Sequence, residues 1–337
     1  MSALTALALF IGRIGRHSAL QPAGPPAERI NGLWWLMFWC LTGVFILVLG
    51  ALALALVSSH RRRLREPATP PAGATDPATE RRMTRAVGGA IGLTVILLFV
   101  LLVASIATGR SISPLSAPKD ALEVEVVGHQ WWWQFEYADP DPSRIVSTAN
   151  ELHIPVGRAV KLRLTSRDVI HSFWVPNLNG KMDLIPGRNA DTWIQADRPG
   201  VYRGQCAEFC GHQHAHMALE VIADPPERFD AWLAAQRQAA PLPASPLAQR
   251  GQQVFLSSSC PLCHAVQGTT AGSGVGPDLT HVASRRTLAA GTLPNNRGNL
   301  AGWILDPQSI KPGNRMPPTA LSPADLEALL AYLESLR

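Results

Sequence analysis

The sequence predicts a membrane hairpin of two helices, then an all-β sandwich, then a small C-terminal domain that ends in an amphipathic helix. Three observations predict this order: two long uncharged stretches, a region of short alternating segments broken by turns, and a Pro/Ala-rich segment where the composition changes. Hydrophobic residues make up 47% of the chain and charged residues only 16%. This composition excludes a disordered chain and favours a membrane portion. The net charge of +5 is spread along the chain, so no nucleic-acid partner is predicted.

The membrane hairpin is predicted over residues 31–108, with spans at 33–57 and 86–108. Both stretches exceed the ~18 residues that a spanning helix needs, and neither has the polar spacing of a soluble core helix. The connection, 58–85, contains the arginines Arg61, Arg62, Arg63, Arg65, Arg81, Arg82 and Arg85. An arginine-rich loop stays in the cytoplasm, so everything after residue 108 is predicted to lie outside.

The N-terminal segment, residues 1–30, is a candidate signal peptide. Its first residues, Met1 to Gly12, are mostly apolar but too few to span a membrane. Arg13 and Arg16 follow the apolar run, whereas the basic residues of a signal peptide precede it. Cleavage therefore stays open.

Residues 118–224 are predicted to form the sandwich. Apolar and polar residues alternate at Leu122–Val127 and Val160–Thr165, and Pro-Gly turns separate the runs. No helical pattern intervenes, so we expect an antiparallel sandwich or barrel.

The chemistry of this domain is concentrated between Cys206 and Met217, with a distant His171. Thiolate, imidazole and thioether are soft and borderline ligands, a set that favours copper. Cys206 and Cys210 are close enough in sequence to converge on one point, and His214 and Met217 can return to it. Two thiolates permit a pair of copper ions bridged by both sulfurs, which suits fast electron transfer.

Two other uses of these cysteines remain open. A disulfide between Cys206 and Cys210 is plausible outside the cytoplasm, although it leaves the nearby His and Met residues unexplained. A zinc site could combine both of them with Cys260 and Cys263. The remaining histidines of the stretch are expected to be ordinary polar neighbours, although either could be mistaken for the ligand: His212 and His216.

Residues 225–246 are predicted to be a Pro/Ala-rich linker, and residues 247–337 a separate domain. This domain contains Cys260-Pro-Leu-Cys263-His264, the attachment signature of haem c. Its two thiols reach both vinyl groups of the porphyrin, and the imidazole of His264 becomes an axial iron ligand. A thioredoxin-like redox pair is the alternative, but no βαβ pattern surrounds the motif.

The second axial haem ligand is predicted to be Met316, the only methionine after Cys263. A thioether ligand raises the haem potential, as a donor to copper requires. His281 is the rival. The chain ends in a helix capped at Ser322, whose apolar stripe is predicted to be core: Leu326, Leu329, Leu330, Leu333 and Leu336.

The pattern C-x-E-x-C-x-x-x-H-x-x-M from Cys206 to Met217, with Asp-Val-x-His-Ser at Asp168–Ser172, resembles subunit II of haem–copper cytochrome c oxidase. The resemblance implies a cupredoxin-like sandwich. It implies a binuclear copper centre held by His171, Cys206, Glu208 through its backbone carbonyl, Cys210, His214 and Met217. The Glu208 side chain would face a magnesium ion at the boundary with subunit I.

The run from Gly128 to Trp133 resembles the aromatic segment through which this family admits electrons, with Trp131 at the position of arrival. Trp132 stands where many relatives have Tyr. A strand of core aromatics is the alternative. The C-terminal part resembles an all-α class I cytochrome c domain, as in the caa3-type oxidases, and the Pro277 carbonyl matches the group that orients the axial imidazole.

The resemblance implies a function in respiration. Electrons from cytochrome c or another external donor would pass through the haem and the copper pair to subunit I, which reduces oxygen. Subunits I and III and the lipid bilayer are the implied partners. The implied location is the bacterial inner membrane, multi-pass, with the metal domains on the periplasmic side. The alternatives are the corresponding subunit of a copper-containing nitric oxide reductase and a membrane-anchored copper or haem assembly protein.

Overall fold

The computed structural model describes residues 17–64 and 77–337, which form two compact units. One unit is the segment Arg29–Ile112, and the other combines the preceding residues with Ser113–Arg337. Most of the candidate signal peptide (residues 1–16) and part of the arginine-rich loop (residues 65–76) lie outside the described residues.

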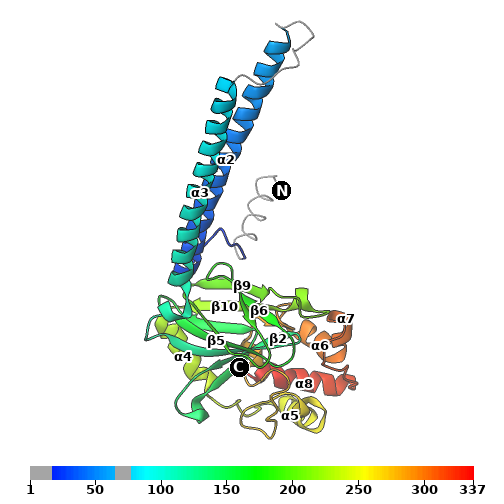
Figure 1. The fold of residues 1–337 in the computed structure, drawn as a ribbon. Helices are drawn as coiled ribbons and strands as arrows, with labels where there is room; N and C mark the ends of the chain where they lie inside the picture. The colour runs from blue at the N-terminus through cyan, green and yellow to red at the C-terminus, as the bar shows by residue number, and fades with distance from the viewer. Residues whose placement is uncertain (1–16, 65–76) are drawn as a thin grey trace, which may run out of the picture. The chain divides into compact units, whose positions relative to one another are not determined.

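The first unit contains two long helices, α2 (Pro25–Arg63) and α3 (Pro77–Ile112), both visible in Figure 1. The Arg29 guanidinium donates a hydrogen bond to the backbone carbonyl of Ser111, which joins the start of α2 to the end of α3. Both helices are long and apolar enough to cross a membrane, and only 0% and 6% of their most apolar windows is buried. Such exposed apolar surface suits lipid better than water. The two predicted apolar helices are therefore confirmed.

The β-sandwich consists of two five-stranded sheets. The first contains, in order, β3 (Val146–Ala149), β2 (Trp132–Tyr137), β1 (Leu122–His129), β5 (Val160–Ser166) and β8 (Ala190–Ile194). The second contains β4 (Glu151–Pro155), β10 (Ala218–Asp224), β9 (Gly200–Cys206), β6 (His171–Trp174) and β7 (Met182–Leu184). The all-β sandwich predicted for this region is confirmed.

The pairing of the strands is mixed, however, and not purely antiparallel as expected. Strand β1 pairs in parallel with β5, and β10 pairs in parallel with β4. Parallel neighbours need a crossover connection between them, and the strands from β2 to β4 supply it between β1 and β5. Alternation along a single strand carries no information about this crossover, so the sequence predicted the strands without their direction.

The segment 225–246, expected to be a linker, begins with a helix. Helix α4 (Pro226–Gln236) buries Phe229 in the sandwich core, at 2% exposure, and stacks Trp232 on His153. The first half of the predicted linker is therefore a helix packed on the sandwich, whereas an extended segment was expected. Its physical reason is the pair of aromatic residues, whose burial against the sandwich outweighs the segment's overall polarity.

The C-terminal domain is helical and has its own hydrophobic core. Its elements are α5 (Pro246–Ser257), the short strands β11 (Thr287–Leu288) and β12 (Leu293–Pro294), α6 (Arg297–Leu305), α7 (Pro307–Ile310) and α8 (Pro323–Ser335). Helices α5 and α8 pack against each other, as Figure 1 shows. The predicted cap is confirmed, because the Ser322 hydroxyl accepts a hydrogen bond from the Asp325 backbone N–H. Of the predicted apolar stripe, all but the partly buried Leu326 are fully buried.

Five short 3-10 helices complete the described part of this unit: η1 (Pro114–Ser116), η2 (Pro142–Arg144), η3 (His214–His216), η4 (Cys260–Leu262) and η5 (Val282–Ser284). Two of them belong to the motifs singled out in the sequence. Helix η3 lies between the second cysteine and the methionine of the copper-type motif, and η4 begins the Cys-x-x-Cys-His motif. Both tight turns bring residues that are close in sequence to one place.

Candidate metal centres

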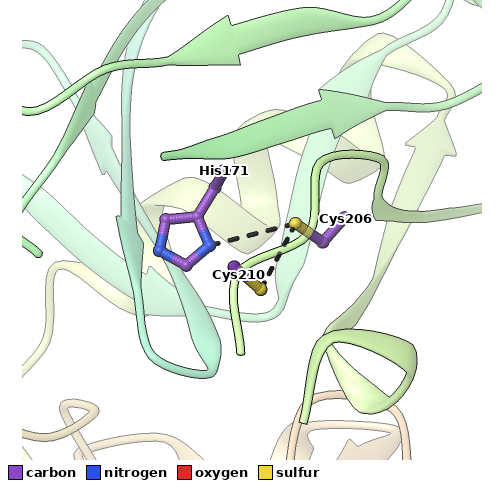
Figure 2. Close-up of side chains that lie close together, drawn as sticks. All are labelled: His171, Cys206 and Cys210. Carbon is purple, nitrogen blue, oxygen red and sulfur yellow. Dashed lines mark hydrogen bonds between the residues drawn. The ribbon is translucent and has the colours of Figure 1, made fainter. Parts of the chain in front are cut away.

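The ligand atoms of the copper-type motif meet at one end of the sandwich. His171 begins β6, Cys206 ends β9, and Cys210 follows in the adjoining loop, as Figure 2 shows. The sulfur atoms of the two cysteines are 3.7 Å apart, and the Nδ1 atom of His171 is 3.9 Å from the Cys206 sulfur. Both cysteines are free thiols, and all three residues are buried. Among the described residues, this is the one group of His, Cys, Asp or Glu side chains that could hold a metal ion.

The remaining atoms of the predicted copper set surround the same two sulfurs. The Nδ1 atom of His214 is 3.6 Å and the Met217 sulfur 3.9 Å from the Cys210 sulfur. The backbone carbonyl oxygen of Glu208 is 3.2 Å from the Cys206 sulfur. His216 instead forms a ring hydrogen bond of 2.8 Å with the Gln213 side chain. The set of imidazole nitrogens, sulfurs and one carbonyl oxygen fits copper, which accepts all three donor types.

His171 is fixed from two sides. Its Nε2 atom donates a hydrogen bond of 2.9 Å to the Asp168 carboxylate, which leaves Nδ1 directed at Cys206. Burial lowers the pKa of His171, but the hydrogen bonds to Asp168 and Cys206 outweigh it and raise the pKa above its ordinary value. Gly128 lies behind the ring, and a Cβ atom there would come within 2.8 Å of the ring carbon Cδ2. A side chain at residue 128 would therefore displace the imidazole.

The pKa values of the two thiols favour a cation bound between them. The hydrogen bond from Cys210 lowers the pKa of Cys206, although burial opposes ionisation. The same bond, burial and the charge on Cys206 raise the pKa of Cys210. Two thiolates at this distance repel each other, so a metal ion between them is what would allow both to ionise.

The three consecutive tryptophans have different environments. Trp133 is fully buried in the sandwich core, and Trp132 stacks on His129 with ring centroids 4.2 Å apart. The indole nitrogen of Trp131 donates a 2.9 Å hydrogen bond to the backbone carbonyl of Cys210. Trp131 therefore contacts the backbone of a copper-ligand candidate directly.

The four haem-ligand candidates line one cavity of about 370 Å³: Cys260, Cys263, His264 and Met316. Trp131 of the sandwich lines the same cavity. His281, the rival ligand, is buried elsewhere, and its Nε2 atom lies 3.2 Å from the Gln238 carbonyl. A cavity bordered by two thiols, an imidazole and a thioether fits a covalently attached haem.

His264 is oriented as the resemblance implied. Its Nδ1 atom donates a 2.7 Å hydrogen bond to the Pro277 carbonyl, which confirms that expectation and leaves Nε2 for a metal. Burial lowers the pKa of His264, so the ring is neutral and able to act as a ligand. A Cβ atom on Gly276 would lie 2.9 Å from the ring carbon Cε1, so glycine is required here as it is behind His171.

The cytochrome-like domain contacts the sandwich through two strips of residues, which sequence reasoning missed. In the first, Lys311 reaches Trp131, and Arg315 reaches Asp168. In the second, the buried Glu151 carboxylate accepts hydrogen bonds from the backbone N–H groups of Arg286 and Thr287, at 2.5 and 3.3 Å. These pairs are more than 130 residues apart, so local spacing carried no signal for them.

Comparison with known proteins identifies the families of both globular domains. Residues 140–223 match the family model described as cytochrome c oxidase subunit II, periplasmic domain, and residues 248–337 match the cytochrome c model. The chain is 38% identical to cytochrome c oxidase subunit 2 of Alkalihalophilus pseudofirmus, over 99% of this chain and 96% of the relative. It is 35% identical to the same subunit of Bacillus sp. (strain PS3), over 73% of this chain and 72% of the relative.

Among solved structures, the periplasmic domain of subunit II of the Bradyrhizobium japonicum cytochrome oxidase is similar, with 31% identity and a TM-score of 0.34. The match covers 36% of this chain and 96% of the solved domain. Proteins with these names are components of an oxidoreductase complex. Because the identity to the first relative extends along almost the whole of both chains, this chain belongs to the cytochrome c oxidase subunit II family and carries a C-terminal cytochrome c domain.

Proposed function

We propose that this chain is the electron-input subunit of a respiratory terminal oxidase. It takes electrons from cytochrome c or another external donor onto a covalent haem and passes them through a binuclear copper centre to the oxygen-reducing subunit I. Cys260 and Cys263 would attach the haem, and His264 and Met316 would bind its iron. The copper pair is held by His171, Cys206, the Glu208 carbonyl, Cys210, His214 and Met217. Both groups supply one-electron redox chemistry when bound.

The observation that carries this proposal is the position of Trp131. Its ring borders the cavity that contains the haem-ligand candidates, and its indole nitrogen donates to the carbonyl of Cys210 at 2.9 Å. One side chain therefore borders the candidate haem cavity and contacts the backbone of a copper-ligand candidate. Each neighbouring tryptophan has only one half of this arrangement. Trp132 borders the cavity but stacks on His129, and Trp133 donates to the Met217 carbonyl at 3.4 Å but is buried in the sandwich core.

The protein's own residues prepare both centres by holding protons in place. Asp168 keeps the proton of His171 on Nε2, and the Pro277 carbonyl keeps the proton of His264 on Nδ1. In each ring the other nitrogen is then free to bind a metal. A side chain in place of either glycine would displace the ring, because each ring lies directly against a glycine backbone.

The membrane orientation and the partners follow from the hairpin and the family. The arginine-rich loop between α2 and α3 would lie in the cytoplasm of a bacterial inner membrane, with both metal domains on the periplasmic side. Subunits I and III complete the complex. Magnesium at the boundary with subunit I remains a prediction on Glu208, whose carboxylate lies 3.9 Å from the Lys181 ammonium.

Two other functions make different predictions. A nitric oxide reductase would consume nitric oxide in place of oxygen when purified with its catalytic subunit. A copper or haem assembly protein would release its metal and hold fewer ligands, whereas this chain offers the full set for both centres. The family name of the relatives favours the oxidase.

The proposal is tested by replacing Trp131 with Phe in the full-length chain. This change removes the pyrrole part of the indole ring together with its hydrogen bond to Cys210, so haem-to-copper electron transfer should slow by at least about tenfold. Stopped-flow reduction by a small artificial donor, with haem and copper bands followed together, measures the transfer.

The matched control is Trp132→Phe, which alters a ring that borders the same cavity without contacting Cys210, and it should leave the rate unchanged. Each variant should hold two copper ions and one haem that resists extraction into acidic acetone. A single copper ion, or an unchanged rate in Trp131→Phe with slowed transfer in Trp132→Phe, would contradict the assignment.

A further inference from the structure

Lys311 is a lysine in an unusual place. Its side chain is only 3% exposed, and none of the described acidic side chains lies within ion-pairing distance of it. The ammonium group instead donates to three backbone carbonyls: Trp131 at 3.0 Å, His216 at 3.0 Å and Ala289 at 3.2 Å. Burying an ammonium without a counter-charge costs free energy, and three carbonyls match its three donors. We therefore expect the buried ammonium group to hold specific parts of the structure together.

The three carbonyls identify that role, because they come from two domains. Ala289 belongs to the cytochrome c domain, as Lys311 does. The other two belong to the sandwich: Trp131 borders both centres, and His216 lies between the copper-ligand candidates His214 and Met217. Lys311 therefore fastens the cytochrome c domain to the segment of the sandwich that electrons must reach.

The residues that follow Lys311 extend the same contact. The Pro312 carbonyl accepts a 2.8 Å hydrogen bond from the Gln213 side chain. Arg315 donates to the Gln130 side chain at 3.2 Å and lies 3.6 Å from the Asp168 carboxylate, which orients His171. Arg315 also directly precedes Met316, the haem-ligand candidate. Lys311, Pro312 and Arg315 thus contact the copper end of the sandwich, while Met316 of the same loop lines the candidate haem cavity.

We propose that Lys311 and Arg315 form a clasp that docks the Met316 loop of the cytochrome c domain onto the copper end of the sandwich. This inference rests on the proposed function and adds a requirement to it. The haem domain is not a freely moving tethered donor. Lys311 is a positioning residue that acts through the Trp131 and His216 backbone, and Arg315 is a weaker one that acts through Asp168.

The test compares Lys311→Met with the unaltered full-length chain. Methionine preserves the length and apolar stem of the side chain but cannot donate, so three carbonyls lose their partner and the docked arrangement loosens. Haem-to-copper transfer should slow by at least about tenfold while both metal spectra stay the same. It should also become dependent on solvent viscosity, because the loosened domain must diffuse back before each transfer.

A second readout does not depend on electron transfer. The Ala218 backbone N–H donates across the same domain boundary to the Ala290 carbonyl at 3.1 Å, next to Ala289. In Lys311→Met, hydrogen exchange of the Ala218 amide should accelerate at least about tenfold, while the amides between β1 and β5 stay protected. The matched control is Lys161→Met, which removes a half-exposed lysine that lies 4.0 Å from Glu123 and Asp191. It should change neither measurement.

The outcomes separate this inference from the proposed function. If the unaltered chain transfers no electrons from haem to copper, the proposed function fails, and exchange of the Ala218 amide still decides on the clasp. If Lys311→Met keeps the original rate, viscosity independence and exchange, the clasp is wrong and the proposed function stands. Should Lys311→Met fail to accumulate, Arg315→Gln takes its place, because the Arg315 side chain is 67% exposed and its loss leaves the fold intact. Unchanged transfer and exchange in that variant would overturn the inference.

Discussion

The two candidate centres of this chain are built in different ways. In the sandwich, the copper-ligand candidates already touch one another: the sulfur of Cys206, at the end of β9, lies 3.7 Å from the sulfur of Cys210 in the loop that follows. In the cytochrome c domain, the haem-ligand candidates border a cavity of about 370 Å³. Several hydrophobic core residues of that domain line the same cavity: Val282, Leu288, Leu300, Ile304 and Leu333. The strands and the adjoining loop of the sandwich position the copper-ligand candidates by themselves, whereas the proposed haem would complete the core around its own ligand candidates.

The largest expected effect follows from this difference. Replacing Cys260 and Cys263 with Ser prevents covalent attachment, so the cytochrome c domain should lose its core and be degraded by a protease that leaves the original domain intact. Removing copper with a chelator should leave the sandwich protease-resistant. Limited proteolysis with mass spectrometry distinguishes the two regions. Equal sensitivity of both domains after both treatments would show that the centres do not differ in this respect.

Within the sandwich, loss of a cysteine ligand candidate should affect the copper pair more than loss of the methionine. Cys210→Ser removes one of the two bridging sulfurs and should abolish the paramagnetic spectrum of the shared copper pair. Met217→Leu removes only a weak thioether ligand, so it should keep both copper ions, shift their potential and slow electron passage. Both variants should keep a folded sandwich. Paramagnetic resonance, metal analysis and thermal unfolding measure these three effects. Loss of all copper in Met217→Leu, with an intact spectrum in Cys210→Ser, would show that the ligand roles of the two residues are reversed.

The smallest effect is a dependence of stability on pH at the boundary between the two regions. Burial lowers the pKa of Lys311 to about 8, although the nearby Cys210 opposes the shift. In the unfolded chain the lysine keeps its proton up to about pH 10.4, so between these values the folded protein binds fewer protons than the unfolded one. The free energy of unfolding should therefore rise with pH in this window, by no more than about 3 kcal/mol.

Thermal unfolding of the full-length chain and of Lys311→Met at pH 7 and pH 9.5 measures this contribution. The rise should be smaller in Lys311→Met by the amount that Lys311 supplies. Lys161→Met serves as the control and should keep the full rise. The same pH dependence in all three proteins would show that Lys311 does not supply it.

Local patterns predicted much of the fold and the copper-ligand cluster. The residues from Cys206 to Met217 lie within one loop and one 3-10 turn, so their spacing in sequence approximates their spacing in space. The capped helix after Ser322 could also be predicted, because both its cap and its apolar stripe are local features. The parallel pairing of β1 with β5 and the docking of α4 could not be predicted, because both depend on contacts between segments that are distant in sequence.

The contacts of Lys311 show the same limit. Nothing in Ile310-Lys311-Pro312 indicates burial, and lysine is a residue expected at the surface. Its partner Trp131 is 180 residues away. The sequence therefore indicated two separate domains joined by a linker, and the contact between them became visible only in three dimensions.

The buried carboxylate of Glu151 bears on which substitutions the boundary between the two domains tolerates. It captures its partner through the backbone N–H groups of Arg286 and Thr287, which every residue except proline possesses. These two hydrogen bonds therefore set no requirement on the side chain at residue 287, and at residue 286 the side chain adds an ion pair of its own with Glu220. The acceptor is fixed by Glu151, whereas the donor positions tolerate any residue that keeps its backbone N–H.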